Sequence, residues 1–219
     1  MIDFHTHTLF SDGELLPSEL ARRAKVIGYR SICFTDHVDM SNMETVVIDV
    51  KKAVGGLEKH YDLYVFAGVE VTHVPPLLIK EVVKEVRLMG AEIVVLHGET
   101  IAEPVAEGTN RAAIEAGVDI LAHPGLITEE DAYLAKEKGV FLEISARKNH
   151  SLTNGHVWGM VKKTGGRCVI DTDTHAPEDL INKSFARRIL LGAGMNEKEV
   201  KNTFNNAEFL LGELIERRR

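Results

Sequence analysis

Short apolar runs alternate along the chain with longer stretches in which apolar residues recur every three or four positions. The short runs are rich in β-branched and aromatic residues and predict strands, whereas the longer stretches predict amphipathic helices. The expected strands lie near residues 2–5, 31–36, 64–70, 92–97, 119–122, 140–145 and 168–173. Seven strand-then-helix units in succession are typical of a parallel sheet.

Proline and glycine mark the ends of several expected helices, because proline suits a first helical turn and glycine suits a helix end. These signals predict helices over 17–27, 76–89, 104–116, 128–139, 154–163 and 177–191. We expect a last helix that begins after Asn196, breaks near Asn205 and Asn206, and resumes to Ile215. Apolar residues within 38–60 also recur at helical spacing, but the pattern there indicates a helix less clearly.

The first strand is not followed by a glycine-rich phosphate loop of the G-x-G-x-x-G or Walker type, which disfavours a Rossmann or P-loop fold. A closed or nearly closed β/α barrel fits the pattern better. We expect one domain over residues 1–219, including C-terminal helices at about 196–216. In such barrels, functional residues gather at the C-terminal ends of the strands.

Histidines and acids stand at these expected strand ends. His5 and His7 are two residues apart on the first strand and therefore point to the same side, and Asp12 follows them in a turn. The later strand ends supply His37, Glu70, His97, His123, Arg147, Asp173 and His175. Imidazole and carboxylate ligands suit zinc, iron and manganese. Because these ligands outnumber the needs of one ion, we expect two or three divalent ions, with Glu70 able to bridge two.

Composition narrows the range of partners. The 219 residues carry a formal charge of −7, which argues against a long nucleic-acid footprint but allows a short phosphorylated substrate beside bound cations. No apolar run is long enough to span a membrane, and no signal peptide is recognisable. Cys33 and Cys168 lie in apolar runs and are expected to be buried free thiols in a reducing cytoplasm.

The order of motifs His-x-His, Ser-Asp-Gly, Thr-Asp-His, Gly-x-Glu, His-Gly, His-Pro-Gly and Asp-x-His resembles the PHP (polymerase and histidinol phosphatase) family over essentially the whole chain. The resemblance implies a distorted (β/α)7 barrel with up to three metal ions. The implied sites are His5, His7, Glu70 and Asp173 for the first, Glu70, His97 and His123 for the second, and Asp12, His37 and His175 for the third. Some trinuclear members have histidine where this chain has Asp12.

The remaining polar residues of these loops are candidates for substrate contact. Arg147 could hold a phosphate bidentately, although a surface arginine is the alternative. His150, Asn154 and His73 could touch substrate or serve only as loop hydrogen-bonding groups.

Together these features predict a metal-dependent phosphoesterase in which a metal-bridging hydroxide attacks a small phosphomonoester. Glu70 and Asp173 would act through the metals in that reaction. Asp12, His37 and His175 would orient the ester or assist the leaving alkoxide. The alternatives are a phosphoesterase for oligonucleotide ends or nucleotides and a non-catalytic metal-binding accessory protein. The sequence leaves the general acid and the oligomeric state open.

Overall fold

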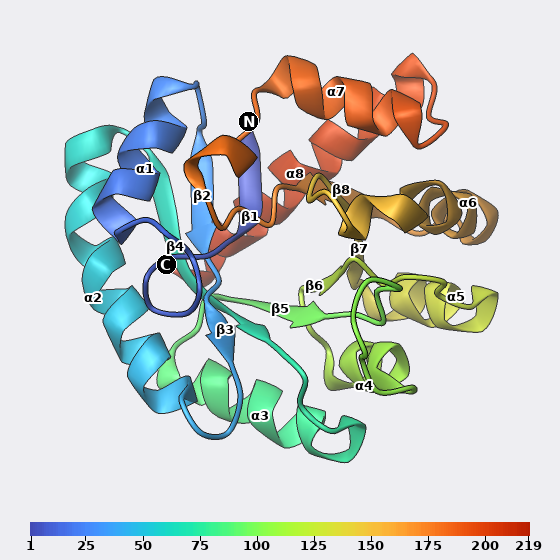
Figure 1. The fold of residues 1–219 in the computed structure, drawn as a ribbon, viewed down its shortest axis with the longest axis horizontal. Coiled ribbons are helices and arrows are strands. Elements are labelled where there is room, and N and C mark those ends of the chain that lie inside the picture. Colours follow the sequence, from blue (N-terminus) through green and yellow to red (C-terminus); the bar gives the residue numbers. More distant parts are fainter.

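The computed structural model describes residues 1–219 and shows strands alternating with helices (Figure 1). The strands are β1 (Ile2–Thr6), β2 (Ser31–Phe34), β3 (His37–Val38), β4 (Tyr64–Val71), β5 (Ile93–His97), β6 (Ile120–Ala122), β7 (Phe141–Ser145) and β8 (Cys168–Asp171). The helices are α1 (Pro17–Val26), α2 (Met43–Tyr61), α3 (Pro76–Met89), α4 (Thr109–Ala116), α5 (Glu129–Lys138), α6 (Asn154–Thr164), α7 (Lys183–Gly192) and α8 (Glu197–Arg217). Two 3₁₀ turns cover His150–Thr153 and Pro177–Asp179.

The strands are parallel and form a nearly closed barrel in the order β1-β2-β4-β5-β6-β7-β8, with the short β3 pairing with β4. Backbone bonds just beyond β8 bring the two ends of the sheet together. The N–H of His7 donates to the carbonyl of Thr174 at 2.8 Å, and the N–H of Asp173 donates to the carbonyl of His5 at 3.0 Å. The helices surround the strands, which confirms the predicted α/β barrel (Figure 1).

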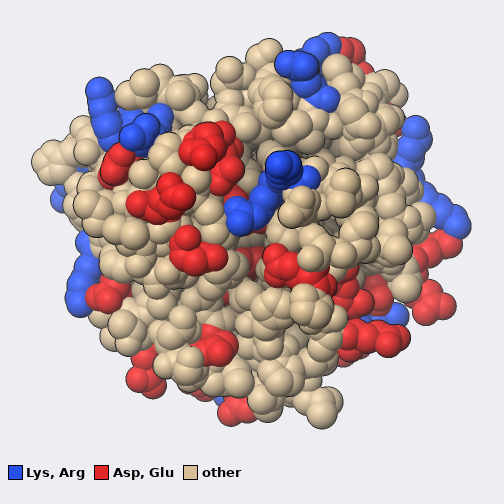
Figure 2. Space-filling view, in the orientation of Figure 1, with Lys and Arg blue, Asp and Glu red and all other residues tan.

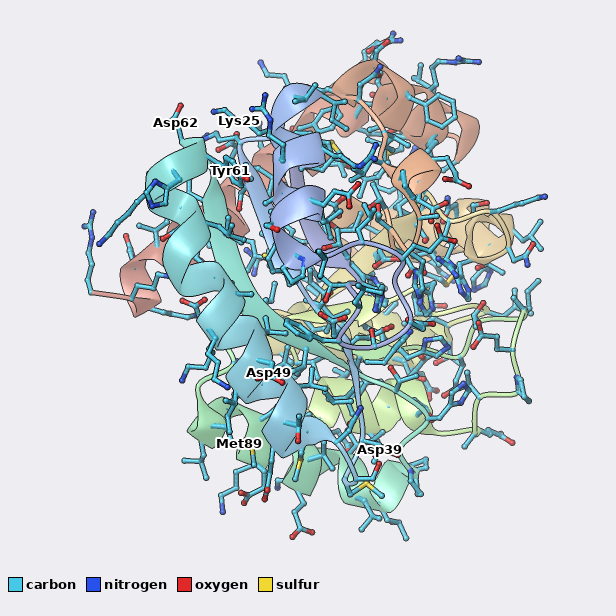
Figure 3. The ribbon with its side chains drawn as sticks, turned by 60° about the vertical axis from the view of Figure 1, so that its left-hand side comes forward. Lys25, Asp39, Asp49, Tyr61, Asp62 and Met89 are labelled. Carbon is cyan, nitrogen blue, oxygen red and sulfur yellow. The ribbon has the colours of Figure 1, made fainter.

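Two lysine side chains join neighbouring helices of the outer layer. Lys25 at the end of α1 lies 3.0 Å from the carboxylate of Asp62, which follows α2 (Figure 3). Lys51 of α2 donates to the backbone carbonyl of Met89 at the end of α3. No helix in the structure is long and apolar enough to cross a lipid bilayer.

The barrel interior changes from apolar to polar along the strands. On β4, Phe66, Gly68 and Glu70 share one face, and Phe66 belongs to a buried apolar cluster whereas Glu70 lies at the strand end. Gly68 is required because a Cβ there would lie 2.5 Å from a side-chain carbon of Ile93. Helix α8 passes behind the strands in Figure 1 and contributes Ala207, Leu210, Leu211 and Leu214 to this cluster. One end of the barrel is therefore filled, and the other is left to polar groups.

Several predicted boundaries were wrong for local reasons. The strand expected at 31–36 ends at Phe34, and the short β3 begins only at His37. The helix expected from residue 104 begins only at Thr109, because Gly108 has a left-handed φ of 89° and residues 101–104 form a turn.

The helix expected at 177–191 is also divided, since Asn182 caps a new helix through the N–H of Phe185. Helix α8, in contrast, runs unbroken through Asn205 and Asn206. Asn206 remains inside the helix and donates to the carbonyl of Cys168 at 2.8 Å. Both cysteines are buried and free.

Candidate metal centre

Strand β1 brings two imidazoles into the polar end of the barrel. His5 and His7 are fully buried, with ring centroids 5.0 Å apart. His5 Nε2 lies 3.3 Å and His7 Nε2 lies 3.5 Å from the same oxygen of Glu70. Asp173 approaches from beyond β8, with its Oδ1 3.3 Å from His7 Nε2. The four side chains expected to form the first site are therefore brought together.

Glu70 is the centre of this arrangement. Its two oxygens lie within 3.6 Å of imidazole nitrogens of His5, His7, His37, His97 and His123. The carboxylate is buried and has one oxygen toward each side of the cluster, since Oε2 faces His5 and Oε1 faces His97. This position is compatible with the expected bridging role.

The donor atoms fall into groups small enough to hold single ions. All nine expected ligands occur in four overlapping groups whose donor atoms lie within 4.8 Å of one another. The groups are His5, His7 and Glu70; His5, His123 and Asp173; Glu70, His97 and His123; and His7, Asp12, His37 and His175. The second expected site reappears unchanged, the third gains His7, and the first is spread over two groups.

The buried polar atoms of the cluster fit metal ions chemically. Several potential ligand atoms are buried without a hydrogen-bond partner. They are His5 Nε2, both ring nitrogens of His7, His97 and His123, and both carboxylate oxygens of Glu70. Leaving such an atom unsatisfied costs about 1–3 kcal/mol. A divalent cation would accept the nitrogen and carboxylate lone pairs together, as imidazole and carboxylate sets do for zinc, iron or manganese.

The pKa shifts of one imidazole and two carboxylates also suit cations, whereas neighbouring carboxylates outweigh burial and raise the pKa of His5, His37 and His97. Burial and the neighbouring His37 lower the pKa of His7 to about 3, so this ring is neutral at pH 7. Burial alone would raise the pKa of Glu70, but His5 and His37 outweigh it and hold that pKa well below 4.5. Asp173 behaves in the same way, because His5 and His7 outweigh its burial and lower its pKa. Neutral imidazole and ionised carboxylate are the forms that ligate metals.

The Asp12 group differs from the others in exposure. Asp12 is 58% exposed, and its Oδ1 lies 3.2 Å from His175 Nε2 and 3.4 Å from His37 Nε2. Buried Asp36 holds the loop that carries Asp12, because it accepts from the Thr8 N–H, the Thr8 hydroxyl and the Ser11 hydroxyl. An ion here would meet solvent more directly than one beside Glu70.

Glu143 was missed by the sequence reasoning. Its Oε2 accepts from His5 Nδ1 at 2.6 Å, and both side chains are fully buried. This contact leaves His5 Nε2 facing Glu70, and partners of this kind orient metal-bound histidines. A carboxylate between the apolar residues Leu142 and Ile144 was the available signal.

A polar hollow of about 460 Å³ opens over the cluster. Twelve residues line it: Ser11, Asp12, His37, Asn42, Thr72, His73, His97, Glu103, Arg147, His150, Asp173 and His175. Glu103 is the second residue that the sequence reasoning missed, because it precedes the helix that was expected to begin at residue 104. Its Oε2 lies 3.1 Å from His97 Nε2, and this contact lowers the pKa of Glu103 to about 2.

The four expected substrate contacts are placed differently. Arg147, His73 and His150 line the hollow. The Arg147 guanidinium also donates to the carbonyl of Asp173 and contacts the His175 ring, so it is closer to the ligands than expected. The expected substrate contact at Asn154 is not supported by this geometry. Its buried amide accepts from the Ser145 N–H and donates to the Ser145 carbonyl, and it is absent from the lining.

Backbone strain is concentrated at the same place. Four non-glycine residues have positive φ, and three of them, His73, His123 and Asp173, belong to the hollow or the cluster. Left-handed conformations of such residues are costly and persist where the surrounding fold imposes them. The fold therefore tolerates backbone strain at the residues that form the cluster and the hollow.

Comparisons with known proteins agree with the geometry. The sequence model of the PHP domain matches residues 3–89. An uncharacterized protein of Methanocaldococcus jannaschii is 51% identical over 203 residues, which cover 92% of this chain and 93% of that protein. A probable phosphatase of Thermoanaerobacter sp. is 28% identical, covering 93% and 90% of the two chains.

Solved structures share the fold. A chain of an archaeal ribonuclease P complex with mature tRNA superposes with a TM-score of 0.75 at 20% identity, covering 96% of this chain and 90% of that chain. Histidinol phosphate phosphatase from Lactococcus lactis, solved with zinc, L-histidinol and phosphate, gives 0.60 at 18% identity, covering 89% and 94%. The PHP-domain match and the relative with 51% identity place the chain in the PHP family, and the match together with the phosphatase relative supports its class: the chain is a hydrolase of the phosphatase and phosphoesterase class.

Proposed function

We propose that this protein hydrolyses a small phosphomonoester at a cluster of two or three divalent ions. The observation that carries the proposal is that the hollow, with Arg147 as its one lysine or arginine, opens over a buried cluster of unpartnered metal-ligating atoms. His5, His7, Glu70 and Asp173 would hold one ion, Glu70, His97 and His123 a second, and Asp12, His37 and His175 a third. Bound ions of this kind acidify water and neutralise phosphoryl charge.

Arg147 is the residue best placed to grip the phosphoryl group. Its side chain is 31% exposed and is the only lysine or arginine among the lining residues. Its contact with the Asp173 carbonyl fixes the guanidinium beside the cluster while other N–H groups remain available. A planar guanidinium can then bind two phosphate oxygens at once.

His150 supplies a second polar contact. Its Nδ1 lies 2.8 Å from the Thr100 hydroxyl, and its Nε2 faces the hollow between Glu103 and Asp173, at 3.5 and 3.8 Å. Burial lowers the pKa of His150 to about 4, so the ring is neutral at pH 7. If the Thr100 hydroxyl donates to Nδ1, the proton of His150 is held at Nε2, where it can donate to the ester.

The charge around the hollow favours a small substrate over a nucleic acid. Figure 2 shows acidic side chains on several sides of the central hollow and a smaller basic group beside them. Asp12 and Glu103 are both exposed at this mouth. With a net charge of −7, the protein would repel the repeated phosphates of a polynucleotide more strongly than one phosphomonoester.

A phosphatase screen tests the proposal. Metal-stripped protein is reloaded separately with Mn²⁺, Zn²⁺ or Fe²⁺ and assayed with phosphomonoesters, dinucleotides and a short oligonucleotide. Phosphate release from monoesters, lost on removal of metal, is the expected result. Preferred cleavage of the oligonucleotide would support the nuclease alternative, and a metal-loaded protein without turnover would support the accessory alternative.

A further inference from the structure

The hollow has an unusual lining for a small-molecule site. None of its twelve lining residues is apolar, whereas ligand pockets are mostly lined by hydrophobic and aromatic side chains with a few polar groups. Its volume of about 460 Å³ leaves room for more than a phosphoryl group. The part of the substrate beyond phosphorus therefore meets polar groups.

Arg147 and Glu103 lie in different parts of the hollow, and Asp12 is a further acidic group beside His175. Arg147 Nε lies 3.7 Å from Asp173 Oδ2, and the same oxygen lies 3.8 Å from His150 Nε2. His150 Nε2 in turn lies 3.5 Å from Glu103 Oε1. The basic side chain and the Glu103 carboxylate are thus separated by Asp173 and His150. A phosphoryl group held by Arg147 would direct its ester substituent toward Glu103.

Glu103 is partly exposed and can accept further hydrogen bonds from a ligand, although its carboxylate also forms a possible metal-ligating group with His73 and His97. Its side chain is 39% exposed, and its ionic contacts are to three imidazoles and to no lysine or arginine. His73 Nε2 lies 3.4 Å from Glu103 Oε2 and is itself 46% exposed. We call this pair, Glu103 and His73, the Glu103 wall.

We propose that the Glu103 wall is the leaving-group subsite and that it selects phosphomonoesters whose alcohol carries further hydroxyl groups. The inference rests on the proposed phosphatase function and adds the class of leaving group. A second phosphate would be repelled by Glu103, and an alkyl or aryl group would desolvate the wall without replacing its hydrogen bonds.

Hydroxyls match the wall better than an ammonium group. A hydroxyl both donates and accepts, so it can donate to Glu103 and accept from a protonated nitrogen of His73. An ammonium group only donates. It would also lie close to the bound cations. A triol or sugar phosphate therefore satisfies more of the lining than an aminoalkyl phosphate does.

Three esters with the same carbon count test the subsite: glycerol 1-phosphate, propyl phosphate and 3-aminopropyl phosphate. The measured quantity is the ratio of kcat/KM values on one metal-loaded preparation, because metal occupancy cancels in that ratio. We expect glycerol 1-phosphate to exceed propyl phosphate by roughly tenfold or more, the scale of a hydrogen bond to a charged group.

Substitutions in the loop that carries Glu103 test whether this residue causes the preference for the glycerol ester. Glu103→Ala should bring the ratio of glycerol to propyl ester toward one, and Glu103→Gln should retain part of it because the amide oxygen still accepts. Exposed Glu107, in the same loop but outside the lining, provides the matched control Glu107→Gln, which should leave the ratio unchanged.

Each other outcome overturns the inference. Equal rates for glycerol and propyl esters, or a preference that survives Glu103→Ala, would exclude a hydroxyl subsite at Glu103. Preference for the aminopropyl ester, lost in Glu103→Gln, would assign the wall to ammonium groups. If no ester is hydrolysed, the proposed function fails, and calorimetric binding of the same esters to the Zn²⁺-loaded protein decides the subsite: tighter glycerol-ester binding lost in Glu103→Ala supports it, and equal binding refutes it.

Discussion

Replacing Glu143 with leucine would remove the hydrogen bond that orients His5, one of the expected metal ligands. Glu143 Oε2 accepts from His5 Nδ1 at 2.6 Å in a fully buried pair, so no water can replace the carboxylate without rearrangement. Loss of a buried charge-assisted hydrogen bond costs about 1.5–3 kcal/mol, and loss of such a partner typically weakens metal binding about 10–100-fold. Glu143→Leu should show this loss, and Glu143→Gln a smaller one, because its amide oxygen can still accept.

Competition with a chromophoric chelator measures the affinity of each variant for Zn²⁺, and elemental analysis gives the number of ions. The absorption spectrum of Co²⁺-loaded protein reports ligand geometry at the His5 site. A role confined to packing would change stability but not this spectrum. Because the leucine variant could fail to fold, the nearly isosteric Glu143→Gln variant keeps the test decisive.

Asp119 supplies the control, since it is a buried carboxylate that accepts from the Val94 N–H and pairs with Arg87 and Arg217. It contacts none of the candidate ligands. Asp119→Asn should lower stability and leave Zn²⁺ affinity and the Co²⁺ spectrum unchanged. Wild-type affinity and spectrum in folded Glu143→Leu protein would refute the orienting role.

Three further substitutions test other parts of the structure. Glu70→Gln should reduce occupancy of two ions together, as counted by elemental analysis, and loss of only one ion would contradict the bridge. Arg147→Ala should lower kcat/KM on a phosphomonoester roughly 10–150-fold, with partial recovery in Arg147→Lys. Its metal content must be measured alongside, because Arg147 touches His175. Burial raises the pKa of Cys168 from 9.0 to about 12, so the unfolded chain loses this proton first and stability should fall as pH rises from 9 toward 12. Denaturant titrations should show a slope shallower by ~1.4 kcal/mol per pH unit in Cys168→Ala, and an unchanged slope would refute this assignment.

The sequence predicted the barrel and the convergence of its ligands for a geometric reason. Parallel strands all end at one face, so the histidines and acids that terminate the apolar runs must meet there. The prediction that His5 and His7 point to the same side needed only the two-residue period of a strand. The prediction for Glu70 needed only its place at the end of β4. Helix boundaries were harder, because the break at Gly108 depends on a backbone conformation that proline spacing does not reveal.

Glu143 and Glu103 were hidden for two different reasons. Glu143 is recognisable only when the distance from β7 to His5 on β1 is known, and sequence separation gives no such distance. Glu103 depends on the path of the loop between β5 and α4, which turns its carboxylate toward His97. Asn154 shows the reverse case, because the amide of a residue expected to contact substrate is instead hydrogen-bonded to the backbone of Ser145 at the end of β7.

The two ends of the barrel differ in the interactions that stabilise them. Beneath the strands, α8 packs apolar side chains against an interior layer that includes Phe66 and Ile93. At the strand ends, the fold holds His123 and Asp173 in left-handed conformations and buries imidazole and carboxylate atoms without partners. Both features oppose folding, and bound cations would remove the cost of the unpartnered atoms. Because ions that bind only the folded state add to its stability, metal binding and folding are linked at this end. We therefore expect the apolar layer under α8 to supply the stability that keeps the ligands assembled before ions bind.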